Sequence, residues 1–166
     1  VNINTSAVGE TPSDYHILSD EHFYPVWEEA QALGVPISIH AFPDPYVPGH
    51  EHNWPRRPAG LFDAIGFPTA SMYLFANLTL GGICETFPKL KFGLFECTIG
   101  WLPQAIHGIN EQKANFGEYF LRSVPKMKLS PEEYIQRQIY FSVEVEDPFI
   151  NTVIEWTGTA DRLLYA

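Results

Sequence analysis

The stretch that decides the fold is FYPVWEEAQALGVPISIH, residues 23–40. Its first half has helical spacing, which predicts a helix that starts near Phe23 and has an apolar face made of Phe23, Val26, Trp27, Ala30 and Leu33. Gly34 follows at the position where helices commonly end in a left-handed residue. Residues 35–40 then predict a short buried strand. A helix that passes to a strand through so short a loop is typical of α/β proteins.

The same alternation extends to both sides of this stretch. The patterns predict strands over residues 1–5, 90–96, 139–143 and 162–166, and helices over residues 68–87, 101–116, 130–138 and 147–158. Helices and strands in alternation indicate a parallel sheet covered by helices. The fold class is therefore α/β, and the strand count suits part of a TIM (β/α)8 barrel of roughly 250 residues. An open doubly wound sheet is the alternative, although no glycine-rich phosphate loop follows a strand.

Composition excludes several classes of protein. The chain has 166 residues, of which 45% are hydrophobic and 18% charged, and this argues against intrinsic disorder. A net charge of -10 argues against a nucleic-acid partner, because binding phosphates requires clustered cations. No apolar run approaches the ~20 residues of a membrane span, so no membrane partner is expected. The two cysteines, Cys84 and Cys97, make no disulfide framework, which favours a cytoplasmic protein.

Both ends of the sequence lie within predicted strands. Val1 opens a strand-like alternation without an initial Met, and the other end stops at Ala166 after an apolar run. Natural termini usually continue into polar, poorly ordered residues. We therefore expect residues 1–166 to be a single partial barrel domain, truncated at both ends.

Function is expected at the carboxyl ends of the parallel strands. His40, Glu96 and Ser142 lie at three such ends, and Glu144 and Glu146 follow the last of them. His40 can bind a divalent metal ion, relay a proton or simply contact a backbone group. Glu96 requires a cation, a metal or hydrogen-bond donors if it is buried, and a salt bridge to an arginine would also satisfy it. Two ligands alone do not complete a catalytic zinc site, which usually has three.

The proline-rich segment 41–59 predicts a long irregular loop, and such loops tend to carry function. Arg56 and Arg57 can bind a substrate carboxylate through their guanidinium groups, with Trp54 beside them, or they can pair with local acids. The His50–His52 pair lies in this loop rather than at a strand end, so we expect solvated or substrate-facing rings rather than metal ligands. No G-x-S-x-G, P-loop or H-E-x-x-H motif is present.

Three blocks carry a family resemblance: residues 23–40, residues 87–103 and residues 158–166. Together they resemble the amidohydrolase-related family. This branch of the amidohydrolase superfamily includes aminocarboxymuconate semialdehyde decarboxylase and the resorcylate and carboxyvanillate decarboxylases. The resemblance implies a distorted TIM barrel with one divalent metal ion, Zn²⁺ foremost and Mn²⁺ as the alternative.

The resemblance also implies roles for particular residues. Residues 1–5 correspond to strand four, and His40 to the metal-binding histidine of strand five. Glu96 takes the strand-six position, where many members have a histidine, so it could act as a general base, an extra ligand or an orienter of the ligands. The family's strand-one ligand pair and its strand-eight aspartate have no counterpart within residues 1–166.

The resulting hypothesis is a metal-dependent hydrolase or non-oxidative decarboxylase that acts on a small carboxylated or cyclic substrate. His40 would bind the metal ion, Glu96 would transfer protons, and Trp54, Arg56 and Arg57 would bind the substrate. The alternative is a non-catalytic barrel that serves binding or assembly, and the glutamate at position 96 favours it. Because the family often dimerises, a homodimer is also an expectation.

Overall fold

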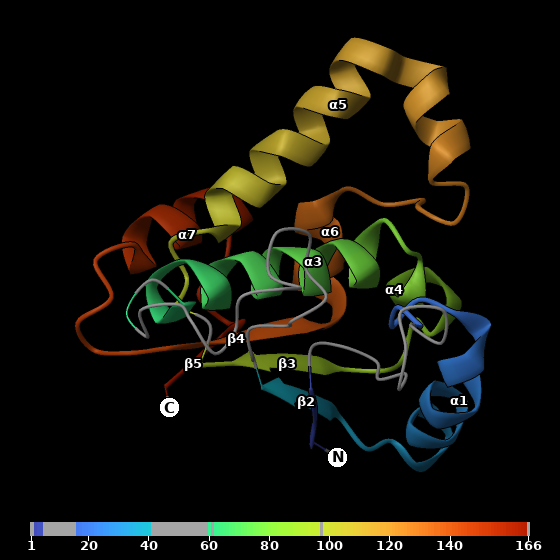
Figure 1. The fold of residues 1–166 in the computed structure, drawn as a ribbon, viewed down its shortest axis with the longest axis horizontal. Coiled ribbons are helices and arrows are strands. Elements are labelled where there is room, and N and C mark those ends of the chain that lie inside the picture. Colours follow the sequence, from blue (N-terminus) through green and yellow to red (C-terminus); the bar gives the residue numbers. More distant parts are fainter. Residues whose placement is uncertain (1, 5–15, 41–59, 61, 97, 166) are drawn as a thin grey trace.

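The structure, a computed structural model, describes residues 2–4, 16–40, 60, 62–96 and 98–165. Within them the chain forms one parallel sheet whose strands follow one another in sequence order (Figure 1). The strands are β1 (Asn2–Asn4), β2 (Ile37–His40), β3 (Phe92–Phe95), β4 (Ile139–Val143) and β5 (Leu163–Tyr165). All five predicted strands are confirmed: β4 has the predicted bounds, and β2 and β3 are shorter than predicted.

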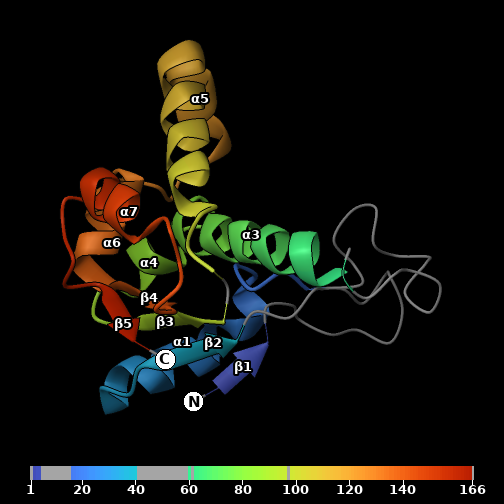
Figure 2. The ribbon, with the colours of Figure 1, turned by 90° about the vertical axis from the view of Figure 1, so that its left-hand side faces the viewer.

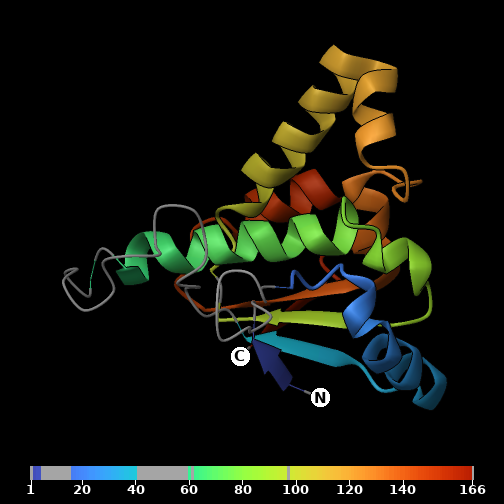
Figure 3. The ribbon, with the colours of Figure 1, turned by 45° about the vertical axis from the view of Figure 1, so that its right-hand side comes forward.

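Helices connect these strands, and α3, α5, α6 and α7 lie on one side of the sheet (Figures 1 and 3). The α-helices are α1 (Tyr24–Leu33), α3 (Phe67–Thr79), α4 (Ile83–Thr86), α5 (Leu102–Ser123), α6 (Pro131–Gln138) and α7 (Ile150–Thr157). A 3-10 turn (Glu21–Phe23) precedes α1, and a π-helical segment (Phe62–Gly66) precedes α3. None of the described helices has the length and apolar character needed to cross a bilayer. The strand order never reverses within the described sheet, so the doubly wound alternative does not fit.

The core lies between the sheet and the helices. Alternate residues of β2 and β4 are fully buried, among them Ile37, Ile39 and Phe141. Trp27 of α1 contacts the Phe92 ring, with the ring centroids 6.0 Å apart, so α1 packs on the same face of the sheet. The opposite face has a hollow of about 470 Å³, lined by residues that include Ser38, Gly93, Phe95, Tyr140 and Leu164. The sheet is therefore covered by helices on one face and concave on the other, as expected for a section of barrel wall.

Two of the predicted helices differ from the structure in their buried face or in their continuity. On α1, Trp27 is buried, whereas Val26 is 45% exposed and Leu33 is 66% exposed, so the apolar face is narrower than predicted. The single helix predicted after Pro68 breaks after Thr79 and resumes as α4, because Gly82 at the break has φ +82°. This left-handed conformation is readily available only to glycine.

Several helix ends lie where the local sequence predicted them. Gly34 ends α1 with φ +66° and Gly158 ends α7 with φ +70°. Ser130 caps α6: its hydroxyl accepts a hydrogen bond from the Glu133 N–H, and the Glu133 carboxylate accepts one from the Ser130 N–H. These hydrogen bonds lower the pKa of Glu133. The helix predicted from residue 147 starts later, at Ile150.

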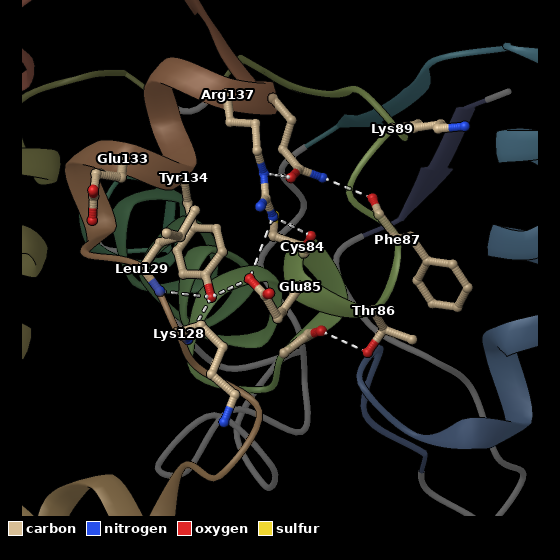
Figure 4. A network of polar contacts seen from close by, with 12 residues as sticks. Cys84, Glu85, Thr86, Phe87, Lys89, Lys128, Leu129, Glu133, Tyr134 and Arg137 are labelled. Atoms are coloured by element: carbon tan, nitrogen blue, oxygen red, sulfur yellow. Dashed lines mark hydrogen bonds and ion pairs between the residues drawn. The ribbon is translucent and has the colours of Figure 1, made fainter.

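A polar network lies where α4 meets α6 (Figure 4). The Tyr134 hydroxyl accepts hydrogen bonds from the backbone N–H groups of residues 128 and 129 and donates to Glu85 Oε2 at 3.0 Å. Arg137 forms an ion pair with Glu85 at 3.6 Å and donates to the Cys84 carbonyl. Tyr134 is fully buried, and this burial raises its pKa, so the hydroxyl keeps its proton for Glu85.

The network extends to the starts of two strands through Gln138, which is fully buried. Its side-chain amide donates to the carbonyls of Phe87, at 3.0 Å, and Leu90, at 2.8 Å. Arg137 Nε donates to the Gln138 side-chain oxygen. Because Gln138 directly precedes β4 and Leu90 lies just before β3, these bonds fix the amino-terminal ends of the two strands together.

We expect Tyr134→Phe in the full-length protein to lower the free energy of unfolding by about 1–3 kcal/mol, because two backbone donors and Glu85 lose a buried partner. Urea unfolding followed by fluorescence measures the change. The matched control is Tyr24→Phe, which removes an exposed hydroxyl hydrogen-bonded to Lys126 and should change stability by less than about 0.5 kcal/mol. Equal losses in the two variants would contradict a structural role for the network.

Candidate functional site

His40 and Glu96 meet at the carboxyl edge of the sheet. The parallel register places His40 of β2 opposite Phe95 of β3, so the residue after Phe95 lies beside the histidine. His40 Nε2 and Glu96 Oε2 are 3.0 Å apart. The His40 side chain is 37% exposed and that of Glu96 is 67% exposed. The structure thus brings together the two residues that the sequence placed at neighbouring strand ends.

The backbone after β3 is held in an unusual conformation. Glu96 has φ +52° and Thr98 has φ +46°, both in the left-handed region that residues other than glycine seldom adopt. Such outliers persist only where surrounding contacts hold them, and they cluster at functional sites. The left-handed backbone of Glu96 and Thr98 is therefore a feature of the candidate site.

Two hydrogen bonds hold this segment, one from strand β4 and one from the loop that follows it. The Glu96 N–H donates to Ser142 Oγ at 2.9 Å, and the Ile99 N–H donates to Asp147 Oδ2, also at 2.9 Å. The other oxygen of Asp147 accepts a hydrogen bond from the Phe149 N–H. The sequence identified Ser142 only as a polar residue at a strand end and Asp147 only as a helix start. A side chain that accepts a hydrogen bond from a backbone N–H far away in the sequence produces no local sequence pattern, so the sequence could not reveal this role.

The Glu96 side chain is more exposed than a carboxylate buried at a strand end would be. The side chain is largely exposed, and its ion-pair partner among the described residues is His40 rather than an arginine. An exposed pair of this kind contributes only about 0–1 kcal/mol to stability. The pair therefore adds little to the stability of the fold. What matters more is which chemistry an imidazole and a carboxylate can perform together.

An imidazole nitrogen and a carboxylate oxygen are donors that Zn²⁺ and Mn²⁺ both accept. His40 and Glu96 bring one of each to a single point. Within the part of the chain that the structure describes, no three His, Cys, Asp or Glu side chains gather into a metal-binding group. The donor types fit a divalent ion, and the described residues supply two of the donors such a site requires.

The other predicted site residues divide into two groups. Glu144 and Glu146 line a hollow of about 490 Å³ together with Trp101, Phe149 and other residues, and His40 and Glu96 are not among its lining residues. Trp54, Arg56 and Arg57 lie outside the described residues, as does the pair His50 and His52. Their substrate-binding or solvated roles stay predictions.

We expect Ser142→Ala to release the backbone around Glu96, because the Glu96 N–H loses its acceptor. Amide hydrogen exchange on the full-length protein should show the Glu96 amide exchanging at least tenfold faster, which corresponds to about 1.4 kcal/mol of lost protection. Ser123→Ala is the control, since that hydroxyl bonds only locally on α5. Unchanged exchange at the Glu96 amide would show that Ser142 does not hold it.

Comparison with known proteins supports the fold. Residues 1–166 match the model of a protein family described as amidohydrolase. No curated protein matches the chain. Among solved structures, an amidohydrolase from Mycobacterium avium subsp. paratuberculosis K-10 is similar, with 19% identity and a TM-score of 0.76. That match covers 98% of this chain and 39% of the other.

Two decarboxylases are also similar. The 5-carboxyvanillate decarboxylase from Sphingomonas paucimobilis has 24% identity and a TM-score of 0.69, covering all of this chain and 46% of that one. The enzyme of the same name from Novosphingobium aromaticivorans, solved with manganese and 4-hydroxy-3-methoxy-5-nitrobenzoic acid, has 21% identity and a TM-score of 0.71, covering all of this chain and 45% of that one.

These likenesses bear on the fold, and the chain spans less than half the length of each of the three solved proteins. The helix-covered parallel sheet corresponds to part of their barrel, which confirms the predicted partial TIM barrel. The family model extends over every residue of the sequence. The chain therefore belongs to the amidohydrolase family, as its three sequence blocks implied.

Proposed function

We propose that the full-length protein is a metal-dependent enzyme of the amidohydrolase superfamily, a non-oxidative decarboxylase or a hydrolase of a small carboxylated or cyclic substrate. The observation that carries the proposal is the pairing of His40 Nε2 with Glu96 Oε2, 3.0 Å apart at the carboxyl edge of a parallel sheet. Active sites of (β/α)8 barrels lie at this edge. Membership of the amidohydrolase family supports the same assignment.

His40 is proposed as a ligand of one divalent metal ion, bound through its imidazole. When bound, such an ion polarises a substrate oxygen or lowers the pKa of a water molecule. The Novosphingobium enzyme and a dihydroxybenzoic acid decarboxylase from Polaromonas sp. JS666 were solved with manganese, which makes Mn²⁺ the first ion to test beside Zn²⁺.

Glu96 is proposed to transfer a proton at the reacting atom of the substrate. Its carboxylate reaches the edge from a backbone in the left-handed conformation, and the Ser142 and Asp147 side chains hold the backbone on either side. A positioned carboxylate can give or accept a proton at a bound substrate. The family often has a histidine at this position. A carboxylate in the same role would protonate different groups of the substrate than a histidine does.

The substrate itself is proposed to carry a carboxylate. Arg56 and Arg57 would bind it through their guanidinium groups, and Trp54 would pack against its ring. Decarboxylation of a hydroxylated aromatic acid is the first reaction to test, since the similar structures include decarboxylases of 5-carboxyvanillate and 2,6-dihydroxybenzoate. The buried free thiol of Cys84 is compatible with the reducing cytoplasm as the proposed location.

We expect His40→Ala to lower the bound metal of the full-length protein from about one ion per chain to less than a tenth of that, because an imidazole ligand is lost. Inductively coupled plasma mass spectrometry on Mn²⁺-loaded and Zn²⁺-loaded protein gives the measurement. His107→Ala is the control, since His107 is an exposed residue of α5 in ring contact with Trp156. Full metal occupancy in His40→Ala would contradict the ligand role.

Glu96→Gln should keep the metal and lose the chemistry. We expect kcat to fall by roughly 10²–10⁴, the range typical of a positioned acid or base, while metal content is unchanged. Release of carbon dioxide from a panel of hydroxylated aromatic carboxylates measures turnover. The control is Glu29→Gln, an exposed acid on α1.

The binding-only alternative predicts a different result. A non-catalytic barrel would show no turnover with carboxylates or hydrolysable cyclic compounds, and it would still bind its ligand after chelation and in His40→Ala. Ligand binding that disappears with the metal would instead support the enzyme.

A further inference from the structure

Helices α3, α5 and α7 lie on the same side of the sheet (Figure 2), and a hollow of about 490 Å³ lies among their starts at the carboxyl edge. Its lining includes Pro68 at the start of α3, Trp101 just before α5 and Phe149 just before α7. Glu144 and Glu146 line it from the loop that follows β4. This rim hollow has a volume in the range of pockets that bind small molecules, so it has room for a ligand.

The rim hollow and the His40–Glu96 pair lie on opposite sides of the wall. Along β2, Ile39 is fully buried on the helix-covered side, whereas Ser38 lines the hollow of about 470 Å³ on the other face. Because side chains alternate between the two faces of a strand, His40 shares the face of Ser38. Trp101 instead packs in the core between the sheet and the helices. A ligand in the rim hollow would therefore contact neither member of the pair.

Two carboxylates of the rim hollow are free to bind a ligand. Glu144 and Glu146 are exposed, and within the described residues neither side chain forms a hydrogen bond or an ion pair. The third acid of the lining, Asp147, differs, because its two oxygens accept hydrogen bonds from the Ile99 and Phe149 N–H groups at 2.9 Å and 3.0 Å. Asp147 therefore holds the two loops together, while Glu144 and Glu146 stay available to a cation.

The lining of the rim hollow is poorly suited to an anion. None of the described residues that line it is a lysine, an arginine or a histidine. Pro68 and Pro148 have no backbone N–H to donate. A negatively charged ligand would be repelled by Glu144 and Glu146 without a compensating positive charge. The charge of the lining thus selects a positively charged ligand.

Aromatic rings form part of the walls. The Phe149 ring lies against Gly100, where a Cβ atom would come within 2.5 Å of the ring, and Phe149 is nevertheless 50% exposed. The Trp101 indole N–H donates to the Thr98 carbonyl at 3.0 Å. Both rings are thus held beside the hollow. Aromatic rings attract ammonium groups through their electron-rich faces, so the walls and the free carboxylates favour the same kind of ligand.

We propose that the rim hollow binds a small organic cation, an ammonium group attached to an apolar body. Glu144 and Glu146 pair with the ammonium group, and the Phe149 and Trp101 rings pack against it and against the apolar body. The net charge of -10 attracts such a ligand from a distance. This inference concerns binding at a second site and does not depend on the proposed chemistry.

A metal ion fits the rim hollow less well than an organic cation. A hard ion such as Ca²⁺ requires roughly six to eight oxygen ligands. In the described part of the chain no three His, Cys, Asp or Glu side chains gather into a metal-binding group, and the Asp147 oxygens already accept hydrogen bonds. An organic cation requires only nearby negative charge and contact with the rings, and the rim hollow offers both.

The test is a ligand-observed NMR titration of the full-length protein with three compounds that share a phenyl ring and a two-carbon linker. They are 2-phenylethylammonium, 2-phenylethanol and 3-phenylpropionate. We expect a dissociation constant of about 1 mM or lower for the ammonium compound and roughly tenfold higher values for the alcohol and the carboxylate. Equal affinity for the three compounds, or no binding of the ammonium compound, would overturn the proposal.

The double variant Glu144→Gln, Glu146→Gln tests the two carboxylates. We expect it to bind 2-phenylethylammonium roughly tenfold more weakly, because both partners of the ammonium group are lost. The matched control is the double variant Glu28→Gln, Glu29→Gln, which removes the same charge from exposed positions on α1 and should bind normally. An equal loss in the two double variants, or no loss in either, would contradict a site at the rim hollow.

The aromatic wall provides a test that leaves the charge unchanged. Gly100→Ala should push the Phe149 ring aside and weaken binding roughly threefold. Gly108→Ala is the control, since its Cβ atom would meet nothing within 4 Å. Glu96→Gln should bind the ammonium compound normally, whatever its effect on turnover. Unchanged binding in Gly100→Ala would overturn the proposal, and so would lost binding in Glu96→Gln, which would place the compound beside His40 instead.

Discussion

The parallel register of β2, β3 and β4 is the constraint on which the candidate site depends. His40 lies opposite Phe95 and Leu94 lies opposite Phe141, so the residues that end the three strands fall at one edge. A register shift by one residue would turn each side chain to the other face of the sheet, which the buried alternate residues forbid. The same burial that stabilises the wall therefore positions His40, and it places Glu96 directly beside it.

The two ends of this wall are held by different means. At the amino-terminal end, buried Tyr134 and Gln138 satisfy backbone groups of the connecting turns, and such buried networks stabilise a single arrangement. At the carboxyl end, the groups are exposed and the backbone of Glu96 lies in the left-handed region. In (β/α)8 barrels the first end usually serves stability and the second serves chemistry.

The features that could be predicted from the sequence are those that a few neighbouring residues determine. The bounds of β4, the Ser130 capping box and the left-handed glycines at positions 34 and 158 all follow from a few adjacent residues. The sequence did not predict exposure of Val26, since that depends on how much of α1 the sheet can cover. Nor could it predict the bond from the Glu96 N–H to Ser142, because those residues are 46 positions apart and meet only through the sheet.

The energetics of the Glu96 segment argue for a positional role. Two left-handed residues, Glu96 and Thr98, cost of order 1–3 kcal/mol each. The exposed ion pair with His40 returns about 0–1 kcal/mol, and the hydrogen bonds to Ser142 and Asp147 return about 0.5–1.5 kcal/mol each. These contributions roughly cancel, so the conformation gives the fold little or no net stability. What it does give is a carboxylate held next to His40 at the edge where barrels of this kind carry out their chemistry.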